Sequence, residues 1–232
     1  MSYFFTSQMP ADGILTGAII DHLISTRIQP EQIINITDLN GSRWQVKLVN
    51  LDKKLRQAQV SFVEYEYIKQ SIAYPDSDNT LLQAQVDKTY LDKMFEILPF
   101  SKFNQVVLFK SQFSPNQSIN QDRLDKILTR SLEQSEKIYK PKIIISDLKI
   151  SQLIQSDYSQ NRLNLVLDTG VANSQVLPKS GNTSVWIGPE GGWSKDELEL
   201  FGNLTNKDAS QFQFVNLGSV VYPAWLCSLG IR

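Results

Sequence analysis

The chain has 232 residues, with 23 basic and 24 acidic side chains, one histidine and one cysteine. This length allows one large or two small domains with a buried core. A single cysteine, Cys227, excludes an internal disulfide and fits a reducing cytoplasm, and the low histidine and cysteine counts leave no zinc-type ligand set. No apolar run approaches the roughly 18 to 20 residues that span a bilayer. We therefore expect a cytoplasmic protein without a membrane segment or a metal.

The first third of the chain is rich in predicted strands. Alternating or β-branched residues predict three of them: Ile33–Thr37, Trp44–Val49 and Ala58–Tyr65. Asn40-Gly41 predicts a tight hairpin turn between the first two strands. The polar, turn-forming segment 71–79 has the composition of a linker. These patterns predict a small β-domain over residues 1–72 and a second domain over residues 73–232.

The second domain alternates strands with helices, which indicates a largely parallel sheet covered on both faces. Apolar residues at helical spacing predict a helix from Asp122 to Tyr139, followed by Pro141. Four runs are short enough to be central strands: Val106–Phe109, Leu163–Leu167, Val185–Ile187 and Phe212–Val215.

A glycine-bearing segment, Gly188-Pro189-Glu190-Gly191-Gly192, follows the predicted strand that ends at Ile187. Two adjacent glycines permit a backbone path that lets a ligand lie against the main chain. Ser194 and Glu197 form a capping box for a helix through Phe201. Acidic residues at this helix start disfavour an anion, so a neutral or cationic ligand fits better. A second turn, Leu217-Gly218-Ser219, follows the strand that ends at Val215, and we expect both turns at one edge of the sheet.

The wording "WIGPEGGWSKDEL", followed by "FVNLGSVVYPAWL", resembles the C-terminal half of the RsmE family. These SPOUT-class enzymes use S-adenosylmethionine to methylate N3 of a uridine in small-subunit (16S) ribosomal RNA. The resemblance extends, more weakly, to four other segments: Tyr3-Phe4-Phe5, residues 21–27, the turn 38–41 and Glu133-Gln134-Ser135. It implies an α/β fold, in which a PUA-like β-barrel precedes a SPOUT-type parallel sheet with a C-terminal trefoil knot.

The resemblance also implies partners and site residues. It implies ribosomal RNA or the small ribosomal subunit as partner, and a homodimer, for which the apolar run 224–229 would form a helix at the interface or pack within one subunit. It implies that the methyl donor is held by Leu167, Ile187, Gly188, Pro189, Glu190, Gly191, Gly192, Leu217, Gly218, Ser219 and Tyr222. It implies RNA contacts by His22, Arg27, Arg130 and Lys137.

Departures from the family pattern leave the catalytic residue unidentified. Val220, Pro223, Trp225 and Leu226 stand in the segment where the family has two arginines and a Glu-Thr pair, and Phe113 stands where it has an arginine. Glu190 is the acidic residue nearest to the donor segment in sequence and is only a weak candidate for a catalytic role. The nearly balanced charge also lacks the basic excess expected of an RNA enzyme. Three interpretations stay open: an RsmE-type enzyme, a catalytically impaired RNA-binding or ribosome-associated homologue, and a methyltransferase for another RNA.

Overall fold

The computed structural model describes residues 3–68, 79–171, 182–208 and 210–216. Two compact units are present. The first comprises the described part of Met1–Pro75 together with Thr129–Lys140, and the second comprises the described parts of Asp76–Leu128 and Pro141–Arg232. Segment 129–140 therefore makes most of its contacts within the first unit.

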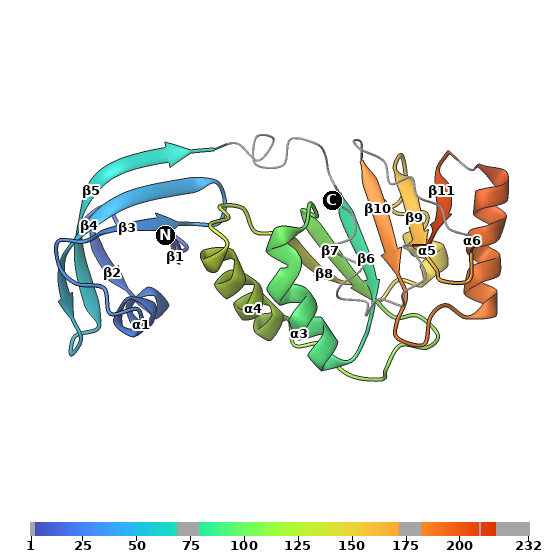
Figure 1. Cartoon of the computed structure of the whole chain (residues 1–232), viewed down its shortest axis with the longest axis horizontal. Coiled ribbons are helices and arrows are strands. Elements are labelled where there is room, and N and C mark those ends of the chain that lie inside the picture. The colour runs from blue at the N-terminus through green and yellow to red at the C-terminus, as the bar shows by residue number, and fades with distance from the viewer. Residues whose placement is uncertain (1–2, 69–78, 172–181, 209, 217–232) are drawn as a thin grey trace. The chain divides into compact units, whose positions relative to one another are not determined.

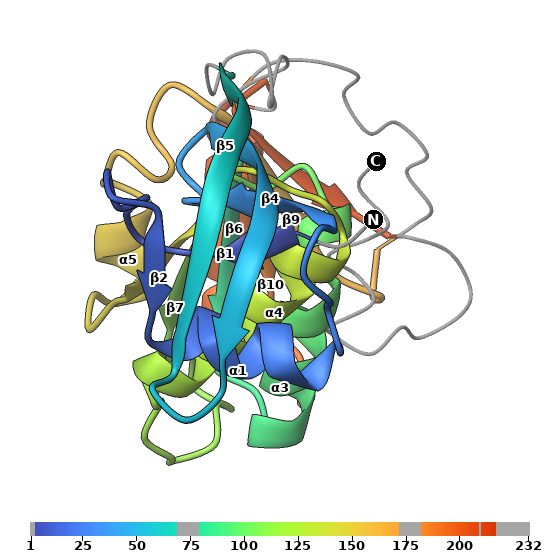
Figure 2. The ribbon, with the colours of Figure 1, turned by 90° about the vertical axis from the view of Figure 1, so that its left-hand side faces the viewer.

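The first unit is built on a five-stranded sheet with the order β1-β3-β4-β5-β2. Its strands are β1 (Tyr3–Phe5), β2 (Ile14–Thr16), β3 (Ile33–Thr37), β4 (Ser42–Asp52) and β5 (Gln57–Tyr67). β3, β4 and β5 pair antiparallel, and β1 joins β3 in parallel. The sheet curls beside helix α1 (Ala18–Ser25), as Figure 2 shows. Ile20 and Leu23 of α1 are fully buried against sheet residues such as Ile36, Val46 and Leu48, which forms one hydrophobic core.

This unit agrees with the expected PUA-like domain. The three predicted strands are confirmed, and β4 and β5 extend beyond the predicted limits. The sheet is an open curl, because the order places β1 and β2 at opposite edges. The predicted hairpin turn is confirmed: the Oδ1 atom of Asp38 accepts hydrogen bonds from the backbone N–H of Asn40 at 2.8 Å and of Ser42 at 3.0 Å.

Helix α4 (Gln121–Gln134) ends five residues before the predicted limit. Glu136 adopts a φ of 57°, which interrupts the helix. The chain then runs extended beside the 38–41 turn: Gly41 N–H donates to the Ile138 carbonyl and Lys140 N–H to the Leu39 carbonyl, both at 2.9 Å. The prediction of a helix to Tyr139 is therefore wrong, because backbone pairing within the first unit overrides the apolar spacing.

The second unit contains a six-stranded sheet with the order β11-β9-β10-β6-β7-β8, in which all neighbours pair in parallel. The strands are β6 (Thr80–Ala84), β7 (Gln105–Phe109), β8 (Lys142–Ile145), β9 (Leu163–Leu167), β10 (Thr183–Ile187) and β11 (Phe212–Val215). The predicted parallel sheet is confirmed. β11 lies at an edge, so the prediction that Phe212–Val215 is a central strand is wrong.

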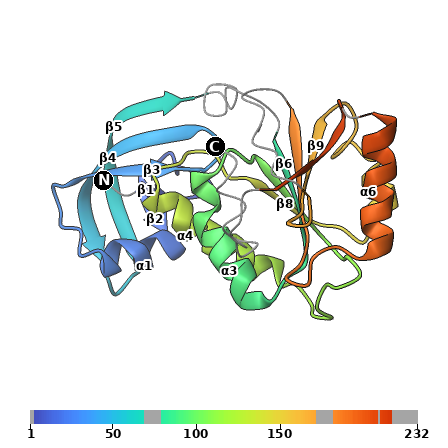
Figure 3. The ribbon, with the colours of Figure 1, turned by 45° about the vertical axis from the view of Figure 1, so that its right-hand side comes forward.

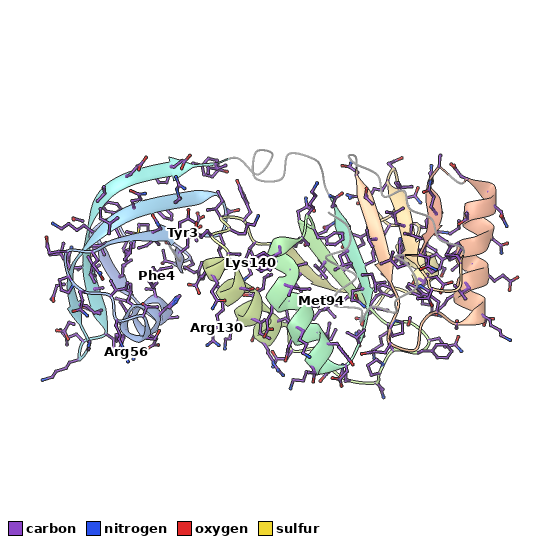
Figure 4. The ribbon with its side chains drawn as sticks, viewed as in Figure 1. Tyr3, Phe4, Arg56, Met94, Arg130 and Lys140 are labelled. Atoms are coloured by element: carbon purple, nitrogen blue, oxygen red, sulfur yellow. The ribbon has the colours of Figure 1, made fainter. Side chains whose placement is uncertain are left out.

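Helices cover both faces of this sheet. The helices are α3 (Lys88–Ile97), the 3-10 turn η1 (Leu98–Phe100), α4, α5 (Ile150–Leu153) and α6 (Lys195–Lys207). Figures 1 and 3 show α3 and α6 on opposite faces. Met94 of α3, labelled in Figure 4, is fully buried. On the other face, Leu153 of α5 and Phe201 of α6 share a core with Val107 and Trp186.

Several expectations fall on residues that the structure does not describe. Segments 172–181 and 217–232 lie outside the described residues. The second of them includes Cys227, the predicted C-terminal helix and the end of the chain, to which the trefoil knot was assigned. Among the described residues, no helix combines the length and hydropathy needed to cross a membrane. In the same residues, no three His, Cys, Asp or Glu side chains are grouped so that they could hold a metal ion.

Candidate functional site

The carboxyl ends of three parallel strands meet where the glycine segment begins. Leu167 of β9 pairs with Ile187 of β10 on one side and with Val215 of β11 on the other. Beyond β11, the side chain of Asn216 donates to the backbone carbonyls of Thr169 at 3.2 Å and Val171 at 2.8 Å. Because these strands pair and Asn216 bonds to the loop after β9, their carboxyl ends form one connected backbone surface. Parallel α/β sheets commonly bind ligands at the carboxyl ends of their strands.

The predicted site residues that the structure describes lie at this edge. They are Leu167, Ile187 and the segment Gly188–Gly192, which we call the glycine loop. The other four, Leu217, Gly218, Ser219 and Tyr222, lie outside the described residues. The glycine loop closes as a turn, because Gly192 N–H donates to the Pro189 carbonyl at 2.8 Å and Gly192 adopts a φ of 71°.

Trp193 fixes the end of the loop against β9. Its ring is buried, and its Nε1–H donates to the Leu167 carbonyl at 2.9 Å. The ring lies between Phe109, with centroids 6.4 Å apart, and Phe201, at 5.2 Å. A Cβ atom on Gly188 would lie 3.2 Å from Trp193 Cε2, so glycine lets the ring pack on the backbone. The sequence signal for this contact was an aromatic residue after Gly-Gly, but the pattern did not reveal its partner.

Two carboxylates tie this region to neighbouring loops. Glu190 Oε1 accepts the Asp87 N–H at 2.9 Å, just before α3. Glu197 Oε1 accepts the Gln112 N–H at 2.9 Å, and its Oε2 accepts the Ser194 N–H at 2.8 Å. The Ser194 hydroxyl accepts the Glu197 N–H at 3.3 Å, which confirms the predicted capping box. Both glutamates thus hold backbone segments in place, and in this structure Glu190 is an anchor of the loop.

Phe113 lies against the outer side of the glycine loop. A Cβ atom on Gly191 would be 3.3 Å from the Cβ of Phe113, so the two residues are in close contact. Phe113 is half exposed, at 50%. The position where the family has an arginine therefore carries an apolar ring next to the loop, and the loop gains no positive charge from it.

A cavity of about 290 Å³ lies beside the start of α6. Most of the residues that line it carry a polar or charged side chain: Lys110, Ser111, Gln112, Lys149, Ile150, Ser151, Ser194, Asp196, Glu197 and Leu200. The set contains two lysines and two carboxylates, and Glu197 already accepts two backbone hydrogen bonds. The balance of charge does not select an anion or a cation, so the cavity alone identifies no ligand.

The four predicted RNA contacts, His22, Arg27, Arg130 and Lys137, all belong to the first unit. His22 Nδ1 lies 3.2 Å from Glu133 Oε1 of α4, and its ring centroid is 4.7 Å from that of Phe4. Glu133 also accepts the Phe5 N–H at 2.8 Å. Phe4 and Arg130 are labelled in Figure 4, with Arg130 near the end of α4. His22 therefore links α1 to α4, and its part in RNA binding remains a prediction.

Comparison with known proteins places the chain in a family. The model of the RNA methyltransferase domain matches residues 75–221. The chain belongs to this RNA methyltransferase domain family. The match covers most of the second unit and includes the glycine loop.

A curated relative of the chain is also an RNA methyltransferase by name. Ribosomal RNA small subunit methyltransferase E of Rickettsia conorii is 27% identical over 170 residues, which cover 68% of this chain and 64% of that protein. The matched part of the chain thus spans less than two thirds of this curated relative. This relative agrees with the resemblance of the chain to the RsmE family.

Solved structures share the fold over nearly the whole chain. A probable rRNA-methyltransferase from Porphyromonas gingivalis has a TM-score of 0.77 and 22% identity, covering 99% of this chain and 94% of that one. The RsmE of Neisseria gonorrhoeae, solved bound to S-adenosyl methionine, has a TM-score of 0.76 and 18% identity with the same coverage. The two-unit architecture is therefore that of rRNA methyltransferase structures.

Proposed function

We propose that the protein transfers a methyl group from S-adenosylmethionine to N3 of a uridine in small-subunit ribosomal RNA. The observation that carries the proposal is the anchored glycine loop at the carboxyl ends of the parallel strands. This loop lies within the segment that the family model matches. Its glycines carry no side chain, so a ligand can contact the main chain directly. The relatives named above support the methyl donor and the RNA class.

The residues present fit S-adenosylmethionine. Its sulfonium is a cation, and carbonyl oxygens at strand ends favour positive charge without a phosphate-binding amide nest. Bound there, the donor would supply an activated methyl group. Ile187, Gly188 and Leu167 would line one side of its pocket. Acidic groups at the start of α6 would disfavour a phosphorylated nucleotide.

The protein's own contribution is mainly orientation. Methyl transfer is an in-line displacement, so its rate depends on holding donor and acceptor in alignment and excluding water. Glu190 and Trp193 anchor the glycine loop, and Glu197 fixes the Ser194 N–H just beyond it, which suits this task. The N3 proton of uracil must leave around the time of transfer, and a nearby base or a stabiliser of the anion would help.

RNA would be presented by the first unit. His22, Arg27, Arg130 and Lys137 all belong to it, and cationic side chains position phosphates without reading sequence. The family resemblance also leads us to propose a homodimer in the cytoplasm. A concentration series by light scattering checks the dimer, and a monomer at every concentration would contradict it.

A second candidate function is RNA binding without catalysis. Phe113 against Gly191 favours it, because an apolar ring replaces the arginine that family members carry there. Purified protein that methylates ribosomal RNA without a partner would eliminate this alternative.

The test begins with calorimetric titration of the protein with S-adenosylmethionine. We expect micromolar-range binding for the wild type and loss of binding for Gly191→Trp, because a side chain at this position meets Phe113 and the indole must distort the loop to fit. Gly202→Trp is the matched control, since Gly202 lies in α6 with open space around its Cα. Methylation of small-subunit RNA, mapped by mass spectrometry, then identifies the base. An unchanged affinity of Gly191→Trp would contradict the proposed pocket.

A further inference from the structure

A glutamine lies in the middle of the parallel sheet, next to the glycine loop. Gln83 of β6 is fully buried, and its neighbours in register are Ile187 of β10 and Leu108 of β7. Buried side-chain amides in proteins nearly always have hydrogen-bond partners for both ends. Gln83 therefore needs an explanation that folding alone does not supply.

Only one end of the Gln83 amide is satisfied within the described residues. Its Nε2 donates to the Ala84 carbonyl at 2.8 Å and to the Gly188 carbonyl at 3.3 Å. Its Oε1 is buried and accepts no hydrogen bond in the part of the chain that the structure describes. The amide cannot be reversed, because its oxygen would then face two carbonyl oxygens. The orientation is thus fixed by chemistry.

The unpaired Oε1 of Gln83 destabilises the folded protein, but it can accept a hydrogen bond from a ligand. A buried polar atom without a partner destabilises the folded state, whereas an apolar side chain of the same length would not. Gln83 also reaches the first residue of the glycine loop, 105 positions away in sequence. It fixes the Gly188 peptide from the strand side, while Trp193 packs on the same residue.

We propose that Gln83 is a positioning and recognition residue of the methyl-donor site. Its Nε2 holds the Gly188 carbonyl, and its Oε1 accepts a hydrogen bond from an N–H or O–H group of bound S-adenosylmethionine. The donor molecule offers such groups on its adenine, ribose and amino-acid parts. This inference rests on the proposed function, because it assumes that the donor binds at the glycine loop.

The test compares Gln83→Met with Gln85→Met by calorimetric titration with S-adenosylmethionine and by urea unfolding without ligand. Gln85 lies two residues further along the chain and is 4% exposed, and its Oε1 also lacks a partner among the described residues. No hydrogen bond joins its side chain to the glycine loop within those residues. It therefore reproduces the burial of Gln83 without the link to Gly188.

We expect Gln83→Met to weaken donor affinity about tenfold or more, as loss of buried hydrogen bonds would. Its ligand-free stability should change little, since removal of the unpaired buried oxygen offsets the loss of the two hydrogen bonds that Nε2 donates to Ala84 and Gly188. Gln85→Met should change the affinity less than about twofold. A second variant, Gln83→Asn, keeps the amide but withdraws it by one methylene, and it should weaken affinity as Gln83→Met does.

The outcomes separate the inference from the proposed function. A wild type that binds no donor overturns both. Normal wild-type binding with unchanged affinity in Gln83→Met, or equal losses in Gln83→Met and Gln85→Met, overturns the role of Gln83 alone. A fall in ligand-free stability that accounts for the lost affinity, or failure of both Gln83 variants to fold, would mean that Gln83 is structural and would also overturn it.

Discussion

Gly41 in the first unit and Gly192 in the second each lie in a short turn and adopt a positive φ, 99° and 71°. Their surroundings differ. A Cβ atom on Gly41 would lie 2.3 Å from the Tyr139 hydroxyl oxygen and 2.6 Å from the Ile68 carbonyl oxygen. A Cβ atom on Gly192 would have no described atom within 4 Å. Tyr139 and the Ile68 carbonyl therefore fill the space next to Gly41, whereas the space next to Gly192 holds no described atom and leaves room for a ligand.

The carboxylates that hold the two turns also bind different backbone groups. Asp38 binds two N–H groups of its own turn with a single oxygen. Around the glycine loop, carboxylates bind N–H groups of other loops: Glu190 that of Asp87, and Glu197 that of Gln112. The 38–41 turn also pairs with residues 138–140, and the glycine loop also has its own hydrogen bond from Gly192 N–H to the Pro189 carbonyl. The two turns therefore differ in what their carboxylates bind: Asp38 binds N–H groups of its own turn, whereas Glu190 binds a neighbouring loop and leaves the N–H groups of its own loop available.

Gly41→Ala and Gly192→Ala give the largest difference between the turns. The first change forces a methyl group onto the Tyr139 hydroxyl and a backbone carbonyl, so it should lower the free energy of unfolding by about 3 kcal/mol or more. Gly192→Ala should cost about 1 kcal/mol, because only the backbone conformation is unfavourable. Urea unfolding of both variants measures the difference. Equal costs would mean that the space around Gly41 is not filled as described.

The variants Glu197→Gln and Asp38→Asn test how much each carboxylate contributes to stability. Glu197 uses one oxygen for Ser194 and the other for Gln112, so an amide would place an NH₂ group against an N–H donor. We expect a loss of about 1–2 kcal/mol in the free energy of unfolding. Asp38→Asn keeps the single accepting oxygen and should cost about 0.5 kcal/mol. A larger loss in Asp38→Asn than in Glu197→Gln would contradict these roles of the two carboxylates.

Gly188→Ala probes the contact between the glycine loop and Trp193. The added methyl group would lie 3.2 Å and 3.3 Å from two ring atoms, so the ring must shift by a few tenths of an ångström. Because the ring is held by Phe109, Phe201 and the Leu167 carbonyl, we expect a loss of about 1 kcal/mol. Donor affinity should fall several-fold in the same variant. Tryptophan fluorescence and calorimetry report the two effects, and an unaltered spectrum with unaltered affinity would contradict a rigid contact.

The sequence predicted these two turns because their signals are local. Asn40-Gly41 between alternating strands defines a hairpin, and Ser194 with Glu197 defines a helix start. Both signals depend on residues within four positions of each other. The parallel sheet was also predictable, because buried apolar runs that alternate with helices allow few other arrangements.

What the sequence could not show depends on contacts between distant residues. Gln83 lies 105 positions from Gly188 and Glu190 lies 103 positions from Asp87, so no periodicity marks either bond. The strand β1 was missed because it is three residues long and pairs with β3 rather than with a neighbour in sequence. Ile138 fitted helical spacing, yet it lies beyond the end of α4 because Glu136 adopts a left-handed conformation. The apolar spacing corresponds to a helix up to Gln134, and beyond that residue it does not.

Tyr139→Phe tests how closed the first turn is. The Tyr139 hydroxyl donates to the Ile68 carbonyl at 2.6 Å, so its removal should cost about 1 kcal/mol near pH 8. Burial, then a hydrogen bond with Tyr67 and the charge of Asp38, raise the pKa of Tyr139 to about 12. Since the unfolded phenol loses its proton near pH 10, the stabilisation is complete below that pH and is lost as the pH rises toward 12. The difference in unfolding free energy between wild type and variant should therefore shrink between about pH 10 and pH 12, whereas contributions from lysines cancel in the comparison. A difference that stays constant over this range would mean that the hydroxyl is open to water, and that the turn at Gly41 is no more enclosed than the one at Gly192.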